Sequence, residues 1–293
     1  MGVSLRFPRG TMKPPFGATI NPDHPLAHKH LMSVLFHGQG LVVDVGAPDT
    51  GPMIYANHHT AGAFDTDIPP RVHLSGGVSP SFHSNREGSC LRCVDGNKLS
   101  LCDSRIFSTT QVTLCVIRRK TDATLRNAAL FSSGATGATA IIAQVPWSDG
   151  GAYFRFGGDT APNLLSVAGL SFSTTIPERW VFTAGPRGSS MWQNGVKVGS
   201  QSTAITRTAS TDNFVLNGSD IGGIGTDLQD WNFFMALDTQ WSDDMCRWWS
   251  AEPYVHLYSE VNTRRYFFLG NPSSAAYRPW FSYGSEVIGA QHL

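Results

Sequence analysis

The stretch ERWVFTAGPRGSSMWQNGVKVGS, Glu178–Ser200, decides the fold class. It holds three short runs rich in β-branched and aromatic residues, separated by two turns. The second turn is Asn194-Gly195, the pair that a type I′ hairpin favours because both of its central residues need a positive φ. The stretch therefore predicts three antiparallel strands in a row, and nothing in it resembles an active site.

The same pattern recurs from Ser89 to about position 240. Short runs such as CLRCVDG, TQVTLCVIRR and AYFRFGG alternate apolar with polar residues, and Gly, Asn and Asp turns separate them. Closely spaced short strands of this kind favour an antiparallel sandwich over βαβ units. We therefore expect an all-β fold, an antiparallel β-sandwich or jelly roll with one short capping helix and extended N- and C-terminal arms.

The capping helix is expected within WSDDMCRWWSAEP. Ser242 is a suitable N-cap, and the two aspartates after it complement the positive end of the helix dipole. Met245 and either Trp248 or Trp249 would face inward, and Pro253 would end the helix.

The composition excludes several classes of protein. Of the 293 residues, 41% are hydrophobic and 15% charged, which suits a folded core better than a disordered chain. The formal net charge is zero, so a nucleic-acid partner is not expected. We expect no secretory signal, because no apolar stretch follows the arginines near residue 1, and no run approaches the length of a membrane helix. The five cysteines are an odd number, and we expect buried free thiols on strands.

The distribution of proline and histidine along the sequence predicts that the chain has three parts. Ten of the 17 prolines and eight of the ten histidines fall within residues 1–85. We interpret this part as an extended arm with long loops and a few short strands, such as LVVDV at positions 41–45, that is not needed for folding of the β domain. Residues 86–260 would form the jelly-roll domain. Residues 261–293 would form an aromatic tail that packs on the sandwich or on a neighbour.

In order along the chain, these segments resemble the concanavalin A-like lectin/glucanase superfamily, specifically the laminin-G-like jelly rolls of bacteriophage proteins. The resemblance spans about Ser89 to Tyr258 and rests on the Asp95-Gly96 turn, the Trp180-led strand, the Asn194-Gly195 hairpin and the segment before the helix. INPDHPLAHKHLMSVLFHGQG resembles the lead-in of phage-encoded members, and TRRYFFLG resembles their exit segment. Before the helix, DWN replaces the usual glycine-led acidic segment, which puts a calcium site in doubt.

The catalytic patterns weigh against an enzyme. The glucanases of this superfamily place two carboxylates on one strand, but no two of the five glutamates lie within five residues of each other. Aspartate pairs could replace them, either Asp65 with Asp67 or Asp227 with Asp230, although aspartates also suit turns. The histidines at 28, 30, 58 and 59 fix no ligand set, so neither a metal nor a cofactor is expected.

Aromatic residues on loops suggest a sugar site, because a sugar ring stacks on Trp or Tyr while Asn and Asp accept its hydroxyls. The candidates are Trp147, Tyr153, Asn217, Asp220 and Trp231. The alternative is that these tryptophans fill the core or a subunit interface.

The sequence thus predicts a non-enzymatic bacteriophage virion protein, located in a particle assembled in the bacterial host cytoplasm, as head decoration or as a tail or fibre component. Its partners would be other virion proteins and further copies of itself, with no nucleic acid and no membrane span. One alternative is a glycan-binding adhesin for the host surface. A weaker alternative is a polysaccharide depolymerase.

Overall fold

The computed structural model describes residues 13–14, 20–21, 23–37, 40–45, 53–56, 71–75, 81–102, 109–133, 137–210, 214–219 and 224–257. The chain divides into two units, and all of these residues belong to the larger one, Phe7–Tyr258. The expected aromatic tail, 261–293, lies outside the described residues, so that prediction stays open.

The larger sheet has ten strands. They are β1 (His30–His37), β2 (Gly40–Val45), β3 (Met53–Ala56), β5 (Ser81–Asn85), β6 (Gly88–Cys93), β8 (Val112–Lys120), β13 (Glu178–Gly185), β14 (Gly188–Gln193), β15 (Val196–Gln201) and β17 (Gln229–Leu237). Eight follow the order β15-β14-β13-β8-β17-β1-β2-β3, while β6 pairs with β17 and β5 with β6. All of these pairs are antiparallel.

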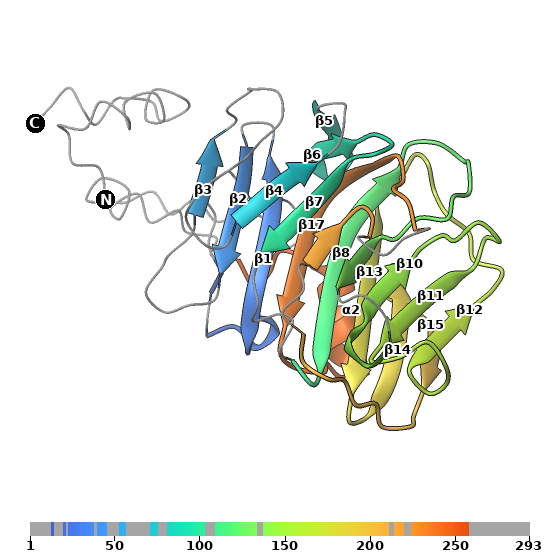
Figure 1. Cartoon of the computed structure of the whole chain (residues 1–293). Helices are drawn as coiled ribbons and strands as arrows, with labels where there is room; N and C mark the ends of the chain where they lie inside the picture. The colour runs from blue at the N-terminus through green and yellow to red at the C-terminus, as the bar shows by residue number, and fades with distance from the viewer. Residues whose placement is uncertain are drawn as a thin grey trace, which may run out of the picture. The chain divides into compact units, whose positions relative to one another are not determined.

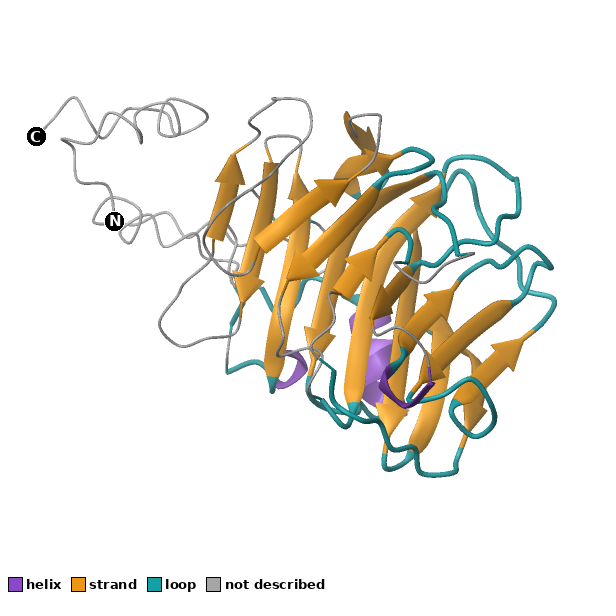
Figure 2. Cartoon of the chain, viewed as in Figure 1, coloured by secondary structure: helices purple, strands orange, loops and turns teal. Residues whose placement is uncertain are grey.

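The smaller sheet has seven strands and lies over one face of the larger one (Figures 1 and 2). They are β4 (Arg71–Ser75), β7 (Lys98–Cys102), β9 (Phe131–Ser133), β10 (Ile141–Gln144), β11 (Ala152–Phe156), β12 (Leu164–Val167) and β16 (Phe214–Leu216). Their order is β12-β11-β10-β9-β16-β7-β4, again antiparallel throughout. The fold is a jelly-roll β-sandwich, and the predicted fold class is confirmed.

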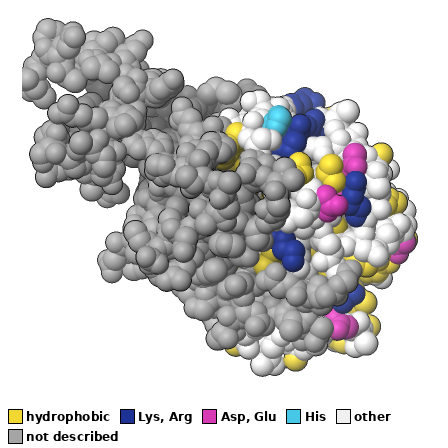
Figure 3. Space-filling model, turned by 45° about the horizontal axis from the view of Figure 1, so that its top comes forward, with side chains coloured by type: hydrophobic (Ala, Val, Ile, Leu, Met, Phe, Trp, Pro, Cys, Tyr) yellow, Lys and Arg dark blue, Asp and Glu magenta, His cyan; other side chains and the backbone are white. Residues whose placement is uncertain are grey.

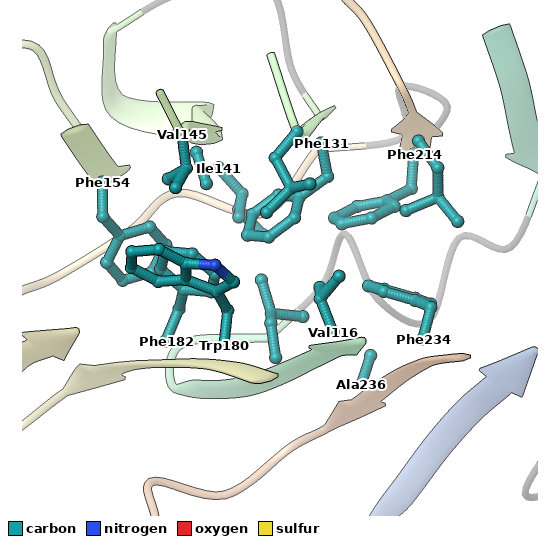
Figure 4. Packing of buried hydrophobic residues seen from close by; sticks show 14 of the residues in the cluster. Val116, Phe131, Ile141, Val145, Phe154, Trp180, Phe182, Phe214, Phe234 and Ala236 are labelled. Atoms are coloured by element: carbon teal, nitrogen blue, oxygen red, sulfur yellow. The ribbon is translucent and has the colours of Figure 1, made fainter. Parts of the chain in front are cut away.

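Aromatic side chains fill the space between the sheets. Phe131 of the smaller sheet meets Phe182 of the larger one edge to face, with ring centroids 5.2 Å apart. Phe214 packs against Phe234 at 5.3 Å, and Trp180 stacks on Phe182 at 5.8 Å (Figure 4). Successive side chains of β8, β13 and β17 point alternately into this core and into a second buried cluster on the outer face of the larger sheet.

The hairpin predicted from Asn194-Gly195 is confirmed. Both residues have positive φ, 51° and 84°, and Gln193 pairs with Val196 across the turn. The three strands of the opening stretch are β13, β14 and β15 in succession, as expected.

The predicted helix is α2 (Asp243–Ala251), which packs on the outer face of the larger sheet. Ser242 is its N-cap and accepts a hydrogen bond from the backbone N–H of Met245 at 3.4 Å. Trp249 is the tryptophan that faces inward, in a second apolar cluster with Phe233 and Cys246. Trp248 is 38% exposed.

The structure places part of the expected arm, residues 1–85, within the larger sheet, and β2 includes the strand predicted from LVVDV. β1 lies inside the larger sheet, hydrogen-bonded to β17 on one side and β2 on the other. Its Val34 and Phe36 are fully buried in the central core. Lys13 also donates to the backbone carbonyls of Phe36 and Ser89. The sandwich therefore includes strands well before the expected boundary at 85/86.

Four of the five cysteines, at positions 90, 93, 115 and 246, are buried free thiols, as predicted. Three lie on strands, and Cys246 lies on α2 instead. Burial raises the pKa of the Cys90, Cys93 and Cys246 thiols to about 12, so they are protonated and poorly reactive at neutral pH. No helix in the described part of the chain is long and apolar enough to cross a membrane.

Candidate functional site

Two of the predicted sugar-binding residues, Trp147 and Tyr153, belong to one hairpin, the connection between β10 and β11. We call residues 145–153 the Trp147 hairpin. Both aromatic side chains are partly exposed, and Asp149 between them is exposed. The hairpin therefore presents two aromatic residues and a carboxylate to solvent.

Backbone hydrogen bonds close the turn. The N–H of Trp147 donates to the carbonyl of Gly151 at 2.8 Å, and the N–H of Gly150 donates back to the carbonyl of Trp147 at 2.9 Å. Gly150 has a φ of 79°, a conformation that glycine adopts without strain. Because these backbone groups bond to each other, the turn has a defined shape.

Asp149 is oriented by its own neighbours. Its Oδ1 accepts the backbone N–H of Gly151 at 2.7 Å, and its Oδ2 accepts the phenolic O–H of Tyr153 at 2.5 Å. The hydrogen bond from Tyr153, with that from Gly151, holds the pKa of Asp149 below its usual value, and the same bond raises the pKa of Tyr153. Asp149 is therefore ionised at neutral pH, with lone pairs left to accept further hydrogen bonds.

Leu125 extends this surface with an apolar side chain. It lies on the loop after β8 and is 43% exposed. A Cβ atom placed on Gly150 would lie 3.7 Å from its Cδ1 atom. The loop after β8 and the Trp147 hairpin therefore lie side by side at one end of the sandwich.

A buried ion pair of the larger sheet holds the first residue of the Trp147 hairpin in place. Arg118 of β8 donates to the carbonyl of Val145 at 2.9 Å and pairs with Glu178 of β13 at 3.1 Å. Glu178 also accepts the indole N–H of Trp180 at 3.0 Å and the backbone N–H of Ser173 at 2.7 Å. The start of the hairpin is thus fixed to the larger sheet by a charged hydrogen-bond network.

The aspartate pair that could have served a hydrolase is held in ion pairs. Asp230 accepts hydrogen bonds from Arg92 and Arg119, and Asp227 pairs with Lys120 at 2.5 Å and with Arg126 at 3.1 Å. On the face drawn in Figure 3, basic and acidic side chains of the described residues lie next to each other at the surface.

The surroundings of these aspartates disfavour catalysis. Burial raises the pKa of Asp230, but the hydrogen bonds from the two arginines outweigh it and leave the pKa below its usual value. A glycosidase needs a protonated carboxyl group as its acid, and this environment opposes protonation. The other pair considered, Asp65 with Asp67, lies outside the described residues.

The structure does not bring the remaining sugar-binding candidates to this surface. Trp231 is 1% exposed and packs in the central core, 6.2 Å from Phe36 between ring centroids. Asn217 is fully buried, and its side chain donates to the carbonyl of Asn97 at 2.8 Å. Both predictions are corrected, because a buried side chain cannot contact a sugar. Asp220 lies outside the described residues.

Among the described residues, no group of three or more His, Cys, Asp or Glu side chains could hold a metal ion. His28 and His30 are described, whereas the histidines at 58 and 59 are not. Within the described chain, the Trp147 hairpin is the arrangement best suited to bind a ligand.

Sequence reasoning missed Asp149, the residue that orders the hairpin. The signal was present in the turn sequence WSDGG, Trp147–Gly151, because aspartate commonly accepts a backbone N–H two residues later. What the sequence did not show is that Tyr153 would point its hydroxyl at the same carboxylate.

Comparison with solved structures finds likenesses at low sequence identity. A mutant of HCR D/C VPI 5995 matches with a TM-score of 0.51 and 11% identity, covering 77% of this chain and 52% of that chain. Domain 4 of the extracellular arabinanase AbnA from Geobacillus stearothermophilus, solved with arabinotriose, gives a TM-score of 0.48 and 13% identity over 60% of this chain and 86% of that one. The sialidase CBM40 from Ruminococcus gnavus, bound to sialyllactose, gives a TM-score of 0.45 and 13% identity. This match covers 55% of this chain and 96% of that one.

No protein-family model matches the chain, and no curated protein matches it significantly. This chain covers about half of the length of the HCR D/C VPI 5995 chain. What this likeness supports is the fold, a jelly-roll β-sandwich.

Proposed function

We propose that this chain is a non-enzymatic glycan-binding module. The observation that carries the proposal is the Trp147 hairpin, where Trp147 and Tyr153 share one ordered turn with the oriented carboxylate of Asp149. Binding sites for small ligands combine apolar and aromatic surface with a few well-placed polar groups. This hairpin has that composition.

The chemistry of a sugar suits these groups. The face of a sugar ring carries C–H groups, and the electron-rich face of an aromatic ring attracts them. The hydroxyl groups at its edge are hydrogen-bond donors, and an ionised carboxylate is a strong acceptor for them. Leu125 adds apolar surface beside the turn. Catalysis is not part of the proposal, because Asp227 and Asp230 are engaged by basic side chains.

A glycan array tests the proposal with a matched pair of tryptophan variants. Trp147→Ala should weaken binding about tenfold, as a loss of about 1.4 kcal/mol would. Trp248→Ala is the control, because Trp248 is a partly exposed tryptophan on α2, on the outer face of the larger sheet. Failure to bind any glycan, or equal losses in the two variants, would reject the proposal.

We also propose a setting for this activity, a bacteriophage particle assembled in the host cytoplasm, with the host surface polysaccharide as the glycan. The support is the sequence resemblance of the segments 20–40 and 263–270 to phage-encoded jelly rolls. A head-decoration or tail-associated virion protein can also be an adhesin, and several copies on one particle would raise the avidity.

Mass spectrometry of purified particles from a phage that encodes the chain tests this setting. The chain should be recovered with the particles through a density gradient. Recovery only from the soluble fraction of the lysate would reject the virion role and leave glycan binding intact. Light scattering of the purified chain would test the expected homo-oligomer.

A further inference from the structure

We propose that the Trp147 hairpin selects uncharged glycans and discriminates against glycans that carry carboxylate groups; this inference rests on the proposed function. The argument comes from the balance of charges around the hairpin, and it begins with Asp149. The two groups that hydrogen-bond to this carboxylate are the neutral Tyr153 hydroxyl and the neutral Gly151 amide. Neither cancels its negative charge, and the side chain is exposed to an approaching ligand.

The basic side chains nearby are already paired. Arg155 lies two residues after Tyr153 on the same strand, and it pairs with Asp159 at 3.0 Å. Arg126 follows Leu125 directly, and both ends of its guanidinium are held by the carboxylate of Asp122, at 2.8 and 2.7 Å.

The two buried basic side chains at this end of the sandwich, Arg118 and Lys120, are paired as well. Arg118 faces Glu178, and Lys120 faces Asp227. These two cations and those at positions 126 and 155 make four, and they meet four carboxylates. Within the described residues, Asp149 is the one carboxylate of this group without a cationic partner.

A ligand at the hairpin would thus meet a negative charge and no unpaired positive one among these residues. Hydroxyl groups gain from such a site because they donate to the carboxylate. A carboxylate on the ligand is repelled and cannot donate, and the repulsion persists at physiological ionic strength over the few ångströms that separate groups in contact. Uncharged, hydroxyl-rich glycans are therefore the class that the site fits.

The test uses an array of neutral oligosaccharides, each printed beside a copy whose primary hydroxyls have been oxidised to carboxylates. The full chain should bind the neutral members, and oxidation should weaken binding at least about fivefold, the factor expected of two unit charges ~4 Å apart in water. Asp149→Asn keeps the shape but removes the charge: its amide oxygen still accepts the N–H of Gly151, and its amide N–H donates to the Tyr153 oxygen in place of the acceptor that is lost. The ratio between paired glycans should therefore shrink to about twofold or less. Asp244→Asn is the matched control, because Asp244 is an exposed carboxylate on α2. It should leave the ratio unchanged.

The outcomes separate the two proposals. Two outcomes would overturn the selectivity: stronger binding to the oxidised copies, or a ratio between the neutral and oxidised glycans that Asp149→Asn leaves unaltered. Glycan binding itself would still stand in both cases, provided that Trp147→Ala weakens or abolishes it. Binding of neither member of any pair would overturn the proposed function, and the selectivity with it.

Discussion

The backbone N–H of Asn21 donates to the carbonyl oxygen of His256 at 2.9 Å, which ties the segment before β1 to the segment after α2. Ile20 and Leu257 form an isolated β-bridge beside this bond. The imidazole of His256 is buried at the junction, 5.8 Å from the ring of Phe233 between centroids. Two segments more than two hundred residues apart in the chain thus close over the outer face of the larger sheet.

The burial of His256 predicts a loss of stability in mild acid. Burial, with smaller contributions from His30 and His24, lowers the pKa of His256 from 6.5 to about 3. Because the unfolded chain binds the proton more tightly, this contribution to stability is complete above about pH 6.5 and is lost as the pH falls towards 3, at about 1.4 kcal/mol per pH unit. Urea unfolding between about pH 7 and pH 4 should show this slope, and His256→Leu should flatten it. Equal slopes in both proteins would contradict the assignment.

Removal of residues 1–70 should abolish the folded sandwich. The deletion takes away β1, whose Val34 and Phe36 are fully buried and whose backbone bonds to β17. Loss of each such side chain costs about 3 kcal/mol, so losing the whole strand exceeds the stability of most domains. Circular dichroism should show no cooperative melt for the truncated chain. A melt close to that of the full chain would restore the arm interpretation.

Gly188 and Gly169 both have a positive φ, but replacement by alanine should cost much more stability at one than at the other. Gly188 has a φ of 88°, and a Cβ there would lie 2.0 Å from the backbone oxygen of Gln201. Gly169 has a φ of 71°, with nothing within 4 Å of the added atom. We expect Gly169→Ala to cost about 1 kcal/mol from backbone strain alone, and Gly188→Ala at least about 3 kcal/mol because a strand must also move. Chemical unfolding of the two variants compares them directly, and equal costs would be inconsistent with this packing.

Local features of the chain were predictable from the sequence, and long-range ones were not. The Asn194-Gly195 turn and the Ser242 cap depend on residues within one turn of each other, and both are as expected. The position of β1 beside β17 depends on pairing across about two hundred residues, which nothing in the proline-rich surroundings of β1 specifies.

Trp231 shows a second limit, because a β-bulge breaks the alternation that sequence patterns rely on. The pairing of β17 with β8 shifts register between Trp231 and Phe233. As a result Trp231 and Phe234 both enter the central core, although their positions differ by three, an odd number that places side chains on opposite faces of a regular strand. Phe233 enters the cluster beneath α2 instead.

Breaking the buried pair of Arg118 and Glu178 should strongly destabilise the sandwich. Both side chains are almost fully buried, so Glu178→Gln leaves the arginine charge without its partner and should cost about 3 to 5 kcal/mol. The exposed pair of Asp244 and Arg247 gives the comparison, since Asp244→Asn should cost less than about 0.5 kcal/mol. Urea unfolding of both variants measures the difference, and a small cost for Glu178→Gln would show that the arginine finds another partner.

Replacing the pair with apolar residues should separate stability from binding. The double variant Arg118→Met with Glu178→Leu removes both charges, so part of the lost stability should return. The return is incomplete because the indole N–H of Trp180 and the backbone N–H of Ser173 lose their acceptor. The variant still lacks the N–H that Arg118 donates to the carbonyl of Val145, so the start of the Trp147 hairpin loses its tie to β8. Glycan affinity should therefore stay about threefold to tenfold below that of the unaltered chain, which corresponds to one lost hydrogen bond. Arg118 acts here as a positioning residue, and full binding by a stable double variant would show that the hairpin holds its shape without it.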